Sequence, residues 1–148
     1  MLKRVNKIGK KEYIEYFDSV AEAVPKWRKK NYYFHSQMEK YIKFIVSQGS
    51  SVLQIGCETG ELLNSLKPRR GLGIDLSPKM IDMAAKNFTH LEFKIGDIET
   101  LDTQEKFDYV VLGTITGYVD DIQVAFEHLK NVCRPDTRVV VVYYNYFW

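Results

Sequence analysis

A glycine-containing turn directly after a short apolar segment constrains the fold of this chain most. Residues 51–55 have the pattern of a buried strand, residues 56–60 contain two glycines, and a helical segment follows. Glycine permits a sharp turn and lets a ligand approach the backbone with no Cβ in the way. The N-terminus of the next helix offers unpaired N–H groups beside that turn. This order of strand, glycine turn and helix is typical of a ligand-binding loop, and taken alone it is equally consistent with a simple turn.

After residue 50 the chain alternates short apolar segments with helical ones. We expect strands over residues 51–55, 71–75, 91–95, 107–112 and 138–144, with a turn at 134–136. Ser77 followed by Pro78 is a helix-start signal, and Asp120 or Asp121 can cap the last helix. The alternation predicts an α/β fold, a Rossmann-like, doubly wound and mostly parallel sheet of about five strands with helices on both faces.

Residues 1–50 have a helical pattern instead. One face of a first helix carries four apolar side chains: Tyr13, Phe17, Val20 and Val24. Pro25 is expected to stop that helix. One stripe of a second helix carries four more: Phe34, Met38, Tyr41 and Ile45. Gly49 is its expected stop.

Polar or small residues follow each expected strand, where ligands of an open α/β sheet bind. Asp75 comes 19 positions after Gly56, near the spacing of a nucleotide-binding unit, and its carboxylate can accept hydrogen bonds from both hydroxyls of a ribose. Asp97 can bond an adenine amino group while Ile98 packs on the ring. Gly113 opens a stretch of small residues where a cofactor or substrate could pass. Together these groups predict a nucleotide-type ligand.

These motifs resemble those of class I S-adenosylmethionine-dependent methyltransferases of the small-molecule type. Residues 52–60 are similar to the family's glycine motif, 73–80 to the motif whose Asp holds the ribose, 96–98 to the adenine-contacting motif and 107–111 to the fourth strand. Residues 16–18 resemble an N-terminal element that covers the cofactor. The resemblance implies an N-terminal helical lid over residues 1–50, a cofactor-binding core over 51–148, and S-adenosylmethionine as the cofactor.

The resemblance also implies the site residues. The expected cofactor-binding residues are Gln54, Gly56, Cys57, Glu58, Gly60, Asp75, Leu76, Met80, Asp97, Ile98 and Gly113. The expected lid or substrate-side residues are Tyr16, Tyr33 and Tyr118. Methyl transfer is an in-line displacement for which the protein supplies alignment, so the fold requires no catalytic residue and we assign none. The expected reaction transfers a methyl group to an unidentified small-molecule acceptor, without a metal.

Three features depart from the family pattern. Gln54 stands where the family has an acidic residue, and it could still serve by hydrogen bonding. Glu58 stands where the family has glycine, so it needs a compatible backbone angle; its carboxylate could crowd the cofactor or face its sulfonium or amino group. The sixth and seventh strands are missing. The chain is then a fragment of a longer polypeptide, or its exposed fifth-strand edge pairs with a second copy in a homodimer.

The composition of the chain limits the classes of partner that we expect it to bind. A net charge of +2, from 21 basic and 19 acidic residues, gives no field typical of nucleic-acid or membrane binding. No apolar run approaches the roughly 20 residues that cross a bilayer. Cys57 and Cys133 show neither a disulfide framework nor metal-ligand spacing. The basic and aromatic residues 26–35 could bind nucleic acid, but a solvated helix end is favoured. We expect a cytoplasmic protein.

Two other functions stay open. The chain could be a non-catalytic cofactor-binding module of a larger multidomain protein, which Glu58 and the missing strands favour. A nicotinamide dehydrogenase is disfavoured, because the glycine spacing is G-x-x-x-G rather than G-x-G-x-x-G and Asp97 has no role there.

Overall fold

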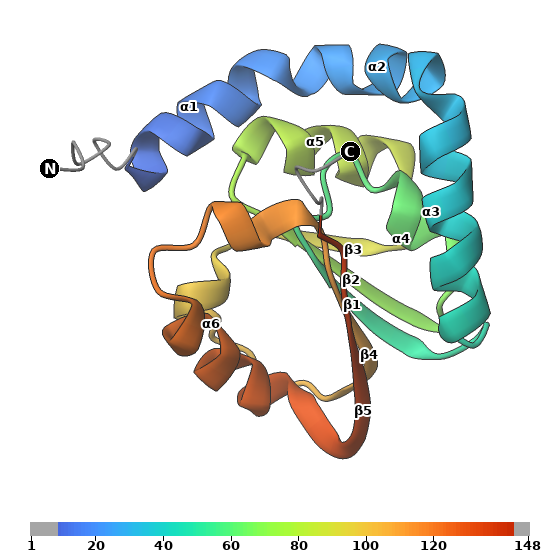
Figure 1. The fold of residues 1–148 in the computed structure, drawn as a ribbon, viewed down its shortest axis with the longest axis vertical. Coiled ribbons are helices and arrows are strands. Elements are labelled where there is room, and N and C mark those ends of the chain that lie inside the picture. The colour runs from blue at the N-terminus through green and yellow to red at the C-terminus, as the bar shows by residue number, and fades with distance from the viewer. Residues whose placement is uncertain (1–8, 144–148) are drawn as a thin grey trace, which may run out of the picture.

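The computed structural model of the protein describes residues 9–143, which form a parallel five-stranded sheet with helices on both faces (Figure 1). The strands are β1 (Ser51–Ile55), β2 (Arg70–Asp75), β3 (Glu92–Ile95), β4 (Phe107–Leu112) and β5 (Cys133–Val141). Their order is β3-β2-β1-β4-β5, and every pairing is parallel. The predicted Rossmann-like α/β fold is therefore confirmed. The strand order reverses between β1 and β4, which places the loops after both strands at the point where such sheets bind ligands.

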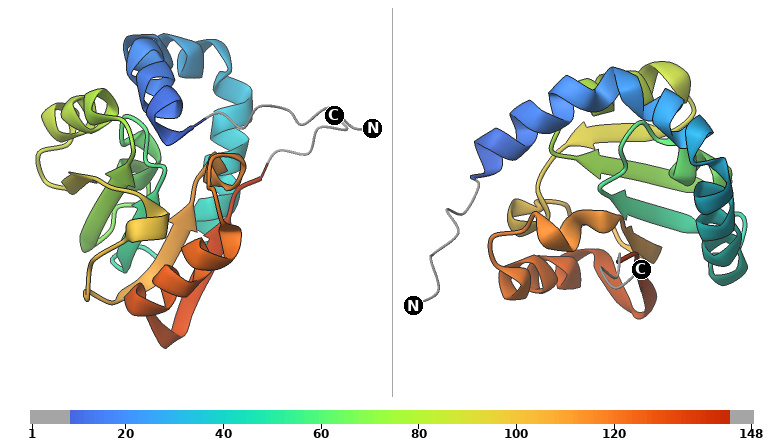
Figure 2. Two further views of the ribbon diagram at one scale, coloured as in Figure 1. Left: turned by 90° about the vertical axis from the view of Figure 1, so that its left-hand side faces the viewer. Right: turned by 45° about the horizontal axis from the view of Figure 1, so that its top comes forward.

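The helices are α1 (Lys10–Val20), α2 (Val24–Lys30), α3 (Tyr32–Ile45), α4 (Glu61–Ser65), α5 (Pro78–Asn87) and α6 (Ile122–Leu129). Short 3₁₀ helices are η1 (Ala21–Ala23), η2 (Ile98–Thr100), η3 (Thr114–Gly117) and η4 (Lys130–Val132). Figure 2 shows α1 and α2 arching across one end of the sheet before α3 descends along its side. No helix within residues 9–143 is both long and apolar enough to span a membrane.

The core lies on both faces of the sheet. Leu53 and Ile55 of β1 pack into a cluster with α6 and η4, while Val52 packs into a second cluster with α3 and α4. All five residues of β1 are buried. A strand covered on both faces needs apolar side chains on both, and Val52 on one face and Leu53 and Ile55 on the other meet that need.

The expected caps of two helices are present. Ser77 Oγ accepts a 3.1 Å hydrogen bond from Met80 N at the start of α5. Asp121, rather than Asp120, caps α6 by accepting from Gln123 N at 2.8 Å. These side chains satisfy N–H groups that the first helical turn leaves without partners.

The N-terminal helices differ from the sequence prediction in two ways. Pro25 does not stop a helix: it lies in the first turn of α2, where its missing N–H costs nothing. The buried stripe of α3 is shifted, because His35 and Ile42 are buried, whereas Phe34, Tyr41 and Ile45 are exposed. Met38 does pack against the core. The helix ends at Ile45, before Gly49.

The C-terminal strand also begins earlier than predicted. Residues 134–136, expected as a turn, lie within β5, and the register with β4 is irregular between Phe107 and Tyr109. That irregularity accommodates the extra residues around Pro135, which cannot donate to a strand ladder. The predicted strand residue 144 lies outside the described residues.

Candidate functional site

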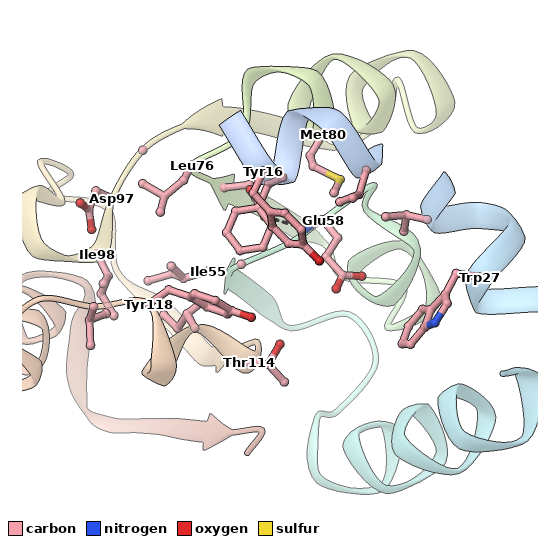
Figure 3. Close-up of a pocket in the computed structure, with 18 of the residues that line it drawn as sticks. Tyr16, Trp27, Ile55, Glu58, Leu76, Met80, Asp97, Ile98, Thr114 and Tyr118 are labelled. Atoms are coloured by element: carbon pink, nitrogen blue, oxygen red, sulfur yellow. Dashed lines mark hydrogen bonds between the residues drawn. The ribbon is translucent and has the colours of Figure 1, made fainter. Parts of the chain in front are cut away.

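A cavity of about 480 Å³ opens at the carboxyl ends of the strands, beneath α1 and α2. Its walls come from four strand ends and from the N-terminal helices (Figure 3). Asp97 and Ile98 lie at one end, and Trp27 lies at the other. The lining residues are Tyr16, Phe17, Val20, Ala23, Val24, Trp27, Ile55, Gly56, Glu58, Asp75, Leu76, Met80, Gly96, Asp97, Ile98, Thr114, Ile115, Tyr118 and Val119.

Asp75 is held rigidly at the end of β2. Its Oδ2 accepts a 2.9 Å hydrogen bond from Glu58 N, and its Oδ1 accepts a 3.0 Å bond from Ser77 N. Burial raises the pKa of Asp75, while these N–H groups act in the opposite direction. An ionised carboxylate has about four acceptor positions, so lone pairs remain for hydroxyl groups of a ligand.

Gly56 and Gly113 allow two backbone segments to come into close contact at the point where the strand order of the sheet reverses. Gly56 has a φ of +73°, and a Cβ built on it would overlap Ile115 Cγ2. A Cβ on Gly113 would stand 2.6 Å from Gly56 O. The loops after β1 and β4 therefore touch through backbone, and any side chain at either glycine would push them apart.

Glu58 enters the cavity from the glycine loop. Its φ of +49° lies in the left-handed region, so the expected need for a special backbone angle is met by a non-glycine residue. Glu58 Oε2 is 3.5 Å from Arg28 Nη1, and the Glu58 side chain is 43 % exposed. Burial among neighbouring groups raises the pKa of Glu58, whereas Arg28 lowers it. The carboxylate extends toward the Trp27 side of the cavity (Figure 3).

Asp97 connects the far end of the cavity to α1. One carboxylate oxygen accepts a 3.0 Å hydrogen bond from Glu99 N and so caps η2. The other forms an ion pair with Lys10, which also lies 2.6 Å from Glu99 Oε2. Lys10 of α1 thus bridges two carboxylates of the core.

A second group of contacts fastens α1 to the start of α5. Asp18 Oδ1 accepts hydrogen bonds from Ser77 Oγ and, at 3.1 Å, from Lys79 N. The rings of Tyr13 and Phe17 each pack edge-on against Tyr118, with centroids 5.1 Å apart. The N-terminal helices therefore cover the cavity through both polar and aromatic contacts.

Most predicted site residues line this cavity. Gly56, Glu58, Asp75, Leu76, Met80, Asp97, Ile98, Tyr16 and Tyr118 do so. The structure does not bring Tyr33 there, because that side chain is 77 % exposed on α3.

Four predicted residues lie beside the cavity without lining it: Gln54, Cys57, Gly60 and Gly113. Gln54 is buried in β1, where Nε2 donates to Gly56 O at 3.4 Å and Oε1 has no protein partner. Cys57 points toward β2, with Sγ 2.9 Å from a Cβ built on Gly73, and burial raises the pKa of its thiol. Gly60 packs under Phe88 and Phe93. These four residues lie behind the residues that line the cavity.

Several cavity residues are absent from the predicted set, notably Val20, Val24 and Trp27, whereas Thr114 and Ile115 belong to the stretch after Gly113 where a ligand is expected to pass. Val20 and Val24 belong to the apolar face expected for the first helix. The periodicity that marked this face was therefore a usable signal, although it could not tell which part of the core the face covers. Trp27 lay in the segment interpreted as a solvated helix end.

His35 of α3 lies outside the cavity wall. It packs edge-on against Trp27 and Phe34, and neither ring nitrogen has a hydrogen-bond partner. Burial lowers the pKa of His35 and the nearby Arg28 lowers it further, which favours the neutral form of the ring. A neutral ring packed between aromatic side chains supports the wall that Trp27 presents to the cavity.

Comparison with known proteins places this geometry in a family. Residues 52–136 match the model of the methyltransferase domain. Nodulation protein S of Sinorhizobium fredii is 28 % identical over 116 residues, covering 72 % of this chain and 52 % of that protein. The chain spans about half the length of such relatives or less.

Two solved structures share the fold. A Thermotoga maritima protein described as a possible histamine N-methyltransferase superposes with a TM-score of 0.74 at 21 % identity, covering 84 % of this chain and 58 % of that one. The N-methyltransferase NodS of Bradyrhizobium japonicum, in complex with S-adenosyl-L-homocysteine, gives 0.63 at 23 % identity, covering 71 % and 58 %. Because the family model matches more than half of its residues, this chain belongs to the methyltransferase domain family.

Proposed function

We propose that this chain binds S-adenosylmethionine in the cavity beneath α1 and α2 and acts as a methyltransferase on a small-molecule acceptor. The observation that carries the proposal is the gathering of Gly56, Asp75 and Asp97 around one cavity. The three residues follow three different strands, and each supplies the chemistry that one part of the cofactor needs.

The residues present fit this cofactor. Asp75 retains free lone pairs for ribose hydroxyls, and Asp97 lies beside Ile98, whose side chain offers an apolar surface for a flat base. Leu76 and Met80 add further apolar wall. The NodS neighbour binds S-adenosyl-L-homocysteine in the same fold, which supports this choice of ligand.

The proposed mechanism follows from the positions of the residues that line the cavity. When bound, the cofactor supplies an electrophilic methyl group on a sulfonium. The chain's own residues hold and orient: Asp75 fixes the ribose, and α1 and α2 exclude water from the reacting end. Tyr118 and Thr114 line the cavity below Tyr16, and we place the acceptor on their side (Figure 3). No titratable side chain is assigned as a base.

A small acceptor is supported by the size of the cavity and by relatives whose names indicate N-methyltransferases. Tyr16 and Tyr118 are our proposed acceptor-side residues. Three expectations stay predictions of the sequence: a cytoplasmic location, the absence of the last two strands of the family's sheet, and the division into a lid and a core.

Titration calorimetry with S-adenosylmethionine and S-adenosylhomocysteine tests the proposal. Asp75→Ala is expected to abolish measurable binding, whereas Asp82→Ala, on the exposed side of α5, should bind as the wild type does. No binding to the wild-type chain at millimolar cofactor would overturn the proposal. Binding without methyl transfer to any acceptor in a panel of small amines, alcohols and acids would favour the non-catalytic module instead.

A further inference from the structure

The side chain at residue 58 is unusual for its backbone conformation. Within residues 9–143, Glu58 and Lys67 are the non-glycine residues with positive φ. Lys67 is exposed just after α4, whereas Glu58 lines the cavity. A strained conformation that persists at a cavity wall points to a role for the side chain it carries.

The charge of Glu58 is not fully balanced by the protein. Among residues 9–143, the cation that pairs with Glu58 is Arg28, which is 12 % exposed and lies closer to Glu39 Oε1, at 3.1 Å, than to Glu58 Oε2, at 3.5 Å. Glu61 Oε2 also approaches Arg28, at 4.0 Å from Nε. Lys43 also pairs with Glu39, at 3.4 Å, so two cations face three carboxylates. The Glu58 side of the cavity therefore keeps a net negative charge that can attract a further cation.

The position of Glu58 follows directly from that of Asp75. The Glu58 backbone donates to Asp75 Oδ2 at 2.9 Å, so the Glu58 side chain starts beside the carboxylate that we expect to hold the ribose. Asp97 and Ile98 lie at the opposite end of the cavity (Figure 3). A ligand with its base near Asp97 and its ribose at Asp75 extends its remaining part toward Glu58.

In S-adenosylmethionine the sulfur is bonded to the ribose 5′ carbon and carries a positive charge. After methyl transfer the sulfur is a neutral thioether, while the ammonium and carboxylate groups are unchanged. Tyr16 and Trp27 lie on either side of Glu58 in the cavity (Figure 3), and aromatic faces also attract cations.

We propose that Glu58 is a charge-recognition residue that makes this site favour S-adenosylmethionine over S-adenosylhomocysteine. The inference rests on the proposed function, and it assigns Glu58 to the sulfonium rather than to the ammonium group that both ligands share. The carboxylate attracts the charged cofactor and loses that attraction once the methyl group has left, which promotes release of the product.

The test is the ratio of the two dissociation constants, measured by calorimetry on the wild type, Glu58→Gln and Glu39→Gln. Glu58→Gln keeps the size of the side chain and removes its charge. It should lower the preference for S-adenosylmethionine by about two- to fivefold, the effect of a partly exposed ion pair. Glu39→Gln removes the other close partner of Arg28 without touching the cavity; Arg28 can then pair more strongly with Glu58, so the ratio should fall, but by less than in Glu58→Gln.

Each outcome decides a different point. An unchanged ratio in Glu58→Gln, or an equal loss of affinity for both ligands, would overturn the assignment to the sulfonium while leaving the proposed function intact. A wild-type chain that binds neither ligand would overturn the proposed function itself. A change of ratio in Glu39→Gln equal to that in Glu58→Gln would show a general field effect and would also refute the specific role.

Discussion

The backbone N–H of Glu58 donates a 2.9 Å hydrogen bond to Asp75 Oδ2, which joins the glycine loop to the end of β2. Glu58 also reaches Arg28 of α2 through its side chain, at 3.5 Å. A single residue therefore connects the expected ribose site with the helices that cover it. Changes at either end of this connection are expected to affect both ligand binding and the position of α2.

Glycine at residue 56 is expected to be essential for stability. Gly56→Ala places a Cβ against Ile115 in a left-handed conformation, and we expect it to lower the free energy of unfolding by about 2 kcal/mol or more. Gly49→Ala has the same backbone problem, with a φ of +74°, but no atom within 4 Å, so about 1 kcal/mol is expected. Gly117→Ala has neither problem and should be within about 0.5 kcal/mol of the wild type.

Urea denaturation of the three variants gives these values. Equal destabilisation by Gly56→Ala and Gly49→Ala would mean that backbone strain alone accounts for the effect. The close approach of the loops after β1 and β4 would then contribute nothing to stability.

Lys10 is expected to hold the N-terminal helices closed. Its ion pairs with Asp97 and Glu99 join α1 to the core, and these groups raise the pKa of Lys10 even though burial opposes them. Lys10→Ala should increase amide hydrogen exchange in α1 by about fivefold, since a partly buried pair contributes on the order of 1 kcal/mol. Lys11→Ala is the matched control, because Lys11 is 90 % exposed and its ion pair, within residues 9–143, is with Glu15 of the same helix. Similar exchange in both variants would contradict a specific closing role for Lys10.

The ligand preference should depend on pH. Burial raises the pKa of Glu58, so its carboxylate loses its charge at a higher pH than an ordinary glutamate does. Arg28 opposes this shift, whereas Asp75 and Glu61 reinforce it. As pH falls through the raised pKa, the preference for S-adenosylmethionine over S-adenosylhomocysteine should fall.

The ratio of the two affinities isolates Glu58 from other titrating groups. Burial also raises the pKa of Asp75, and its protonation should weaken both ligands alike. Calorimetry between about pH 4 and pH 8 should give a sloping ratio for the wild type and a flat one for Glu58→Gln. A wild-type ratio independent of pH would argue against a charged Glu58 at the site.

The sheet was predictable because its signals are local. Residues 51–55 and 107–112 are strands with the predicted bounds, and Ser77 and Asp121 cap the helices that their sequence context indicates. Parallel topology then brings the strand ends together, so the positions of Asp75 and Asp97 followed from the fold class.

The contacts of the N-terminal helices were not predictable in the same way. Helical periodicity placed Phe17 and Val24 on one face, but the pairing of Lys10 with Asp97 depends on long-range packing that no local pattern records. The shift of the buried stripe on α3 has the same origin. Helical periodicity alone gives no reason to bury Ile42 rather than Tyr41. Ile42 is buried because it packs against α4 and β4 in the folded protein.

The outer edge of β5 is expected to promote self-association. Within residues 9–143, β5 pairs with β4 alone, and Val139 and Val141 are exposed on it. An apolar strand with an unpaired edge can add a strand from a second copy. Light scattering after gel filtration should therefore show a mass that rises with concentration.

Val141→Lys should reduce this association, because a charge on an edge strand disfavours pairing. Ile122→Lys removes a similarly exposed apolar side chain from α6 and should have no effect if the edge itself mediates the contact. A wild-type chain that stays monomeric at all concentrations would count against edge pairing, and equal effects of the two variants would indicate general hydrophobic association instead.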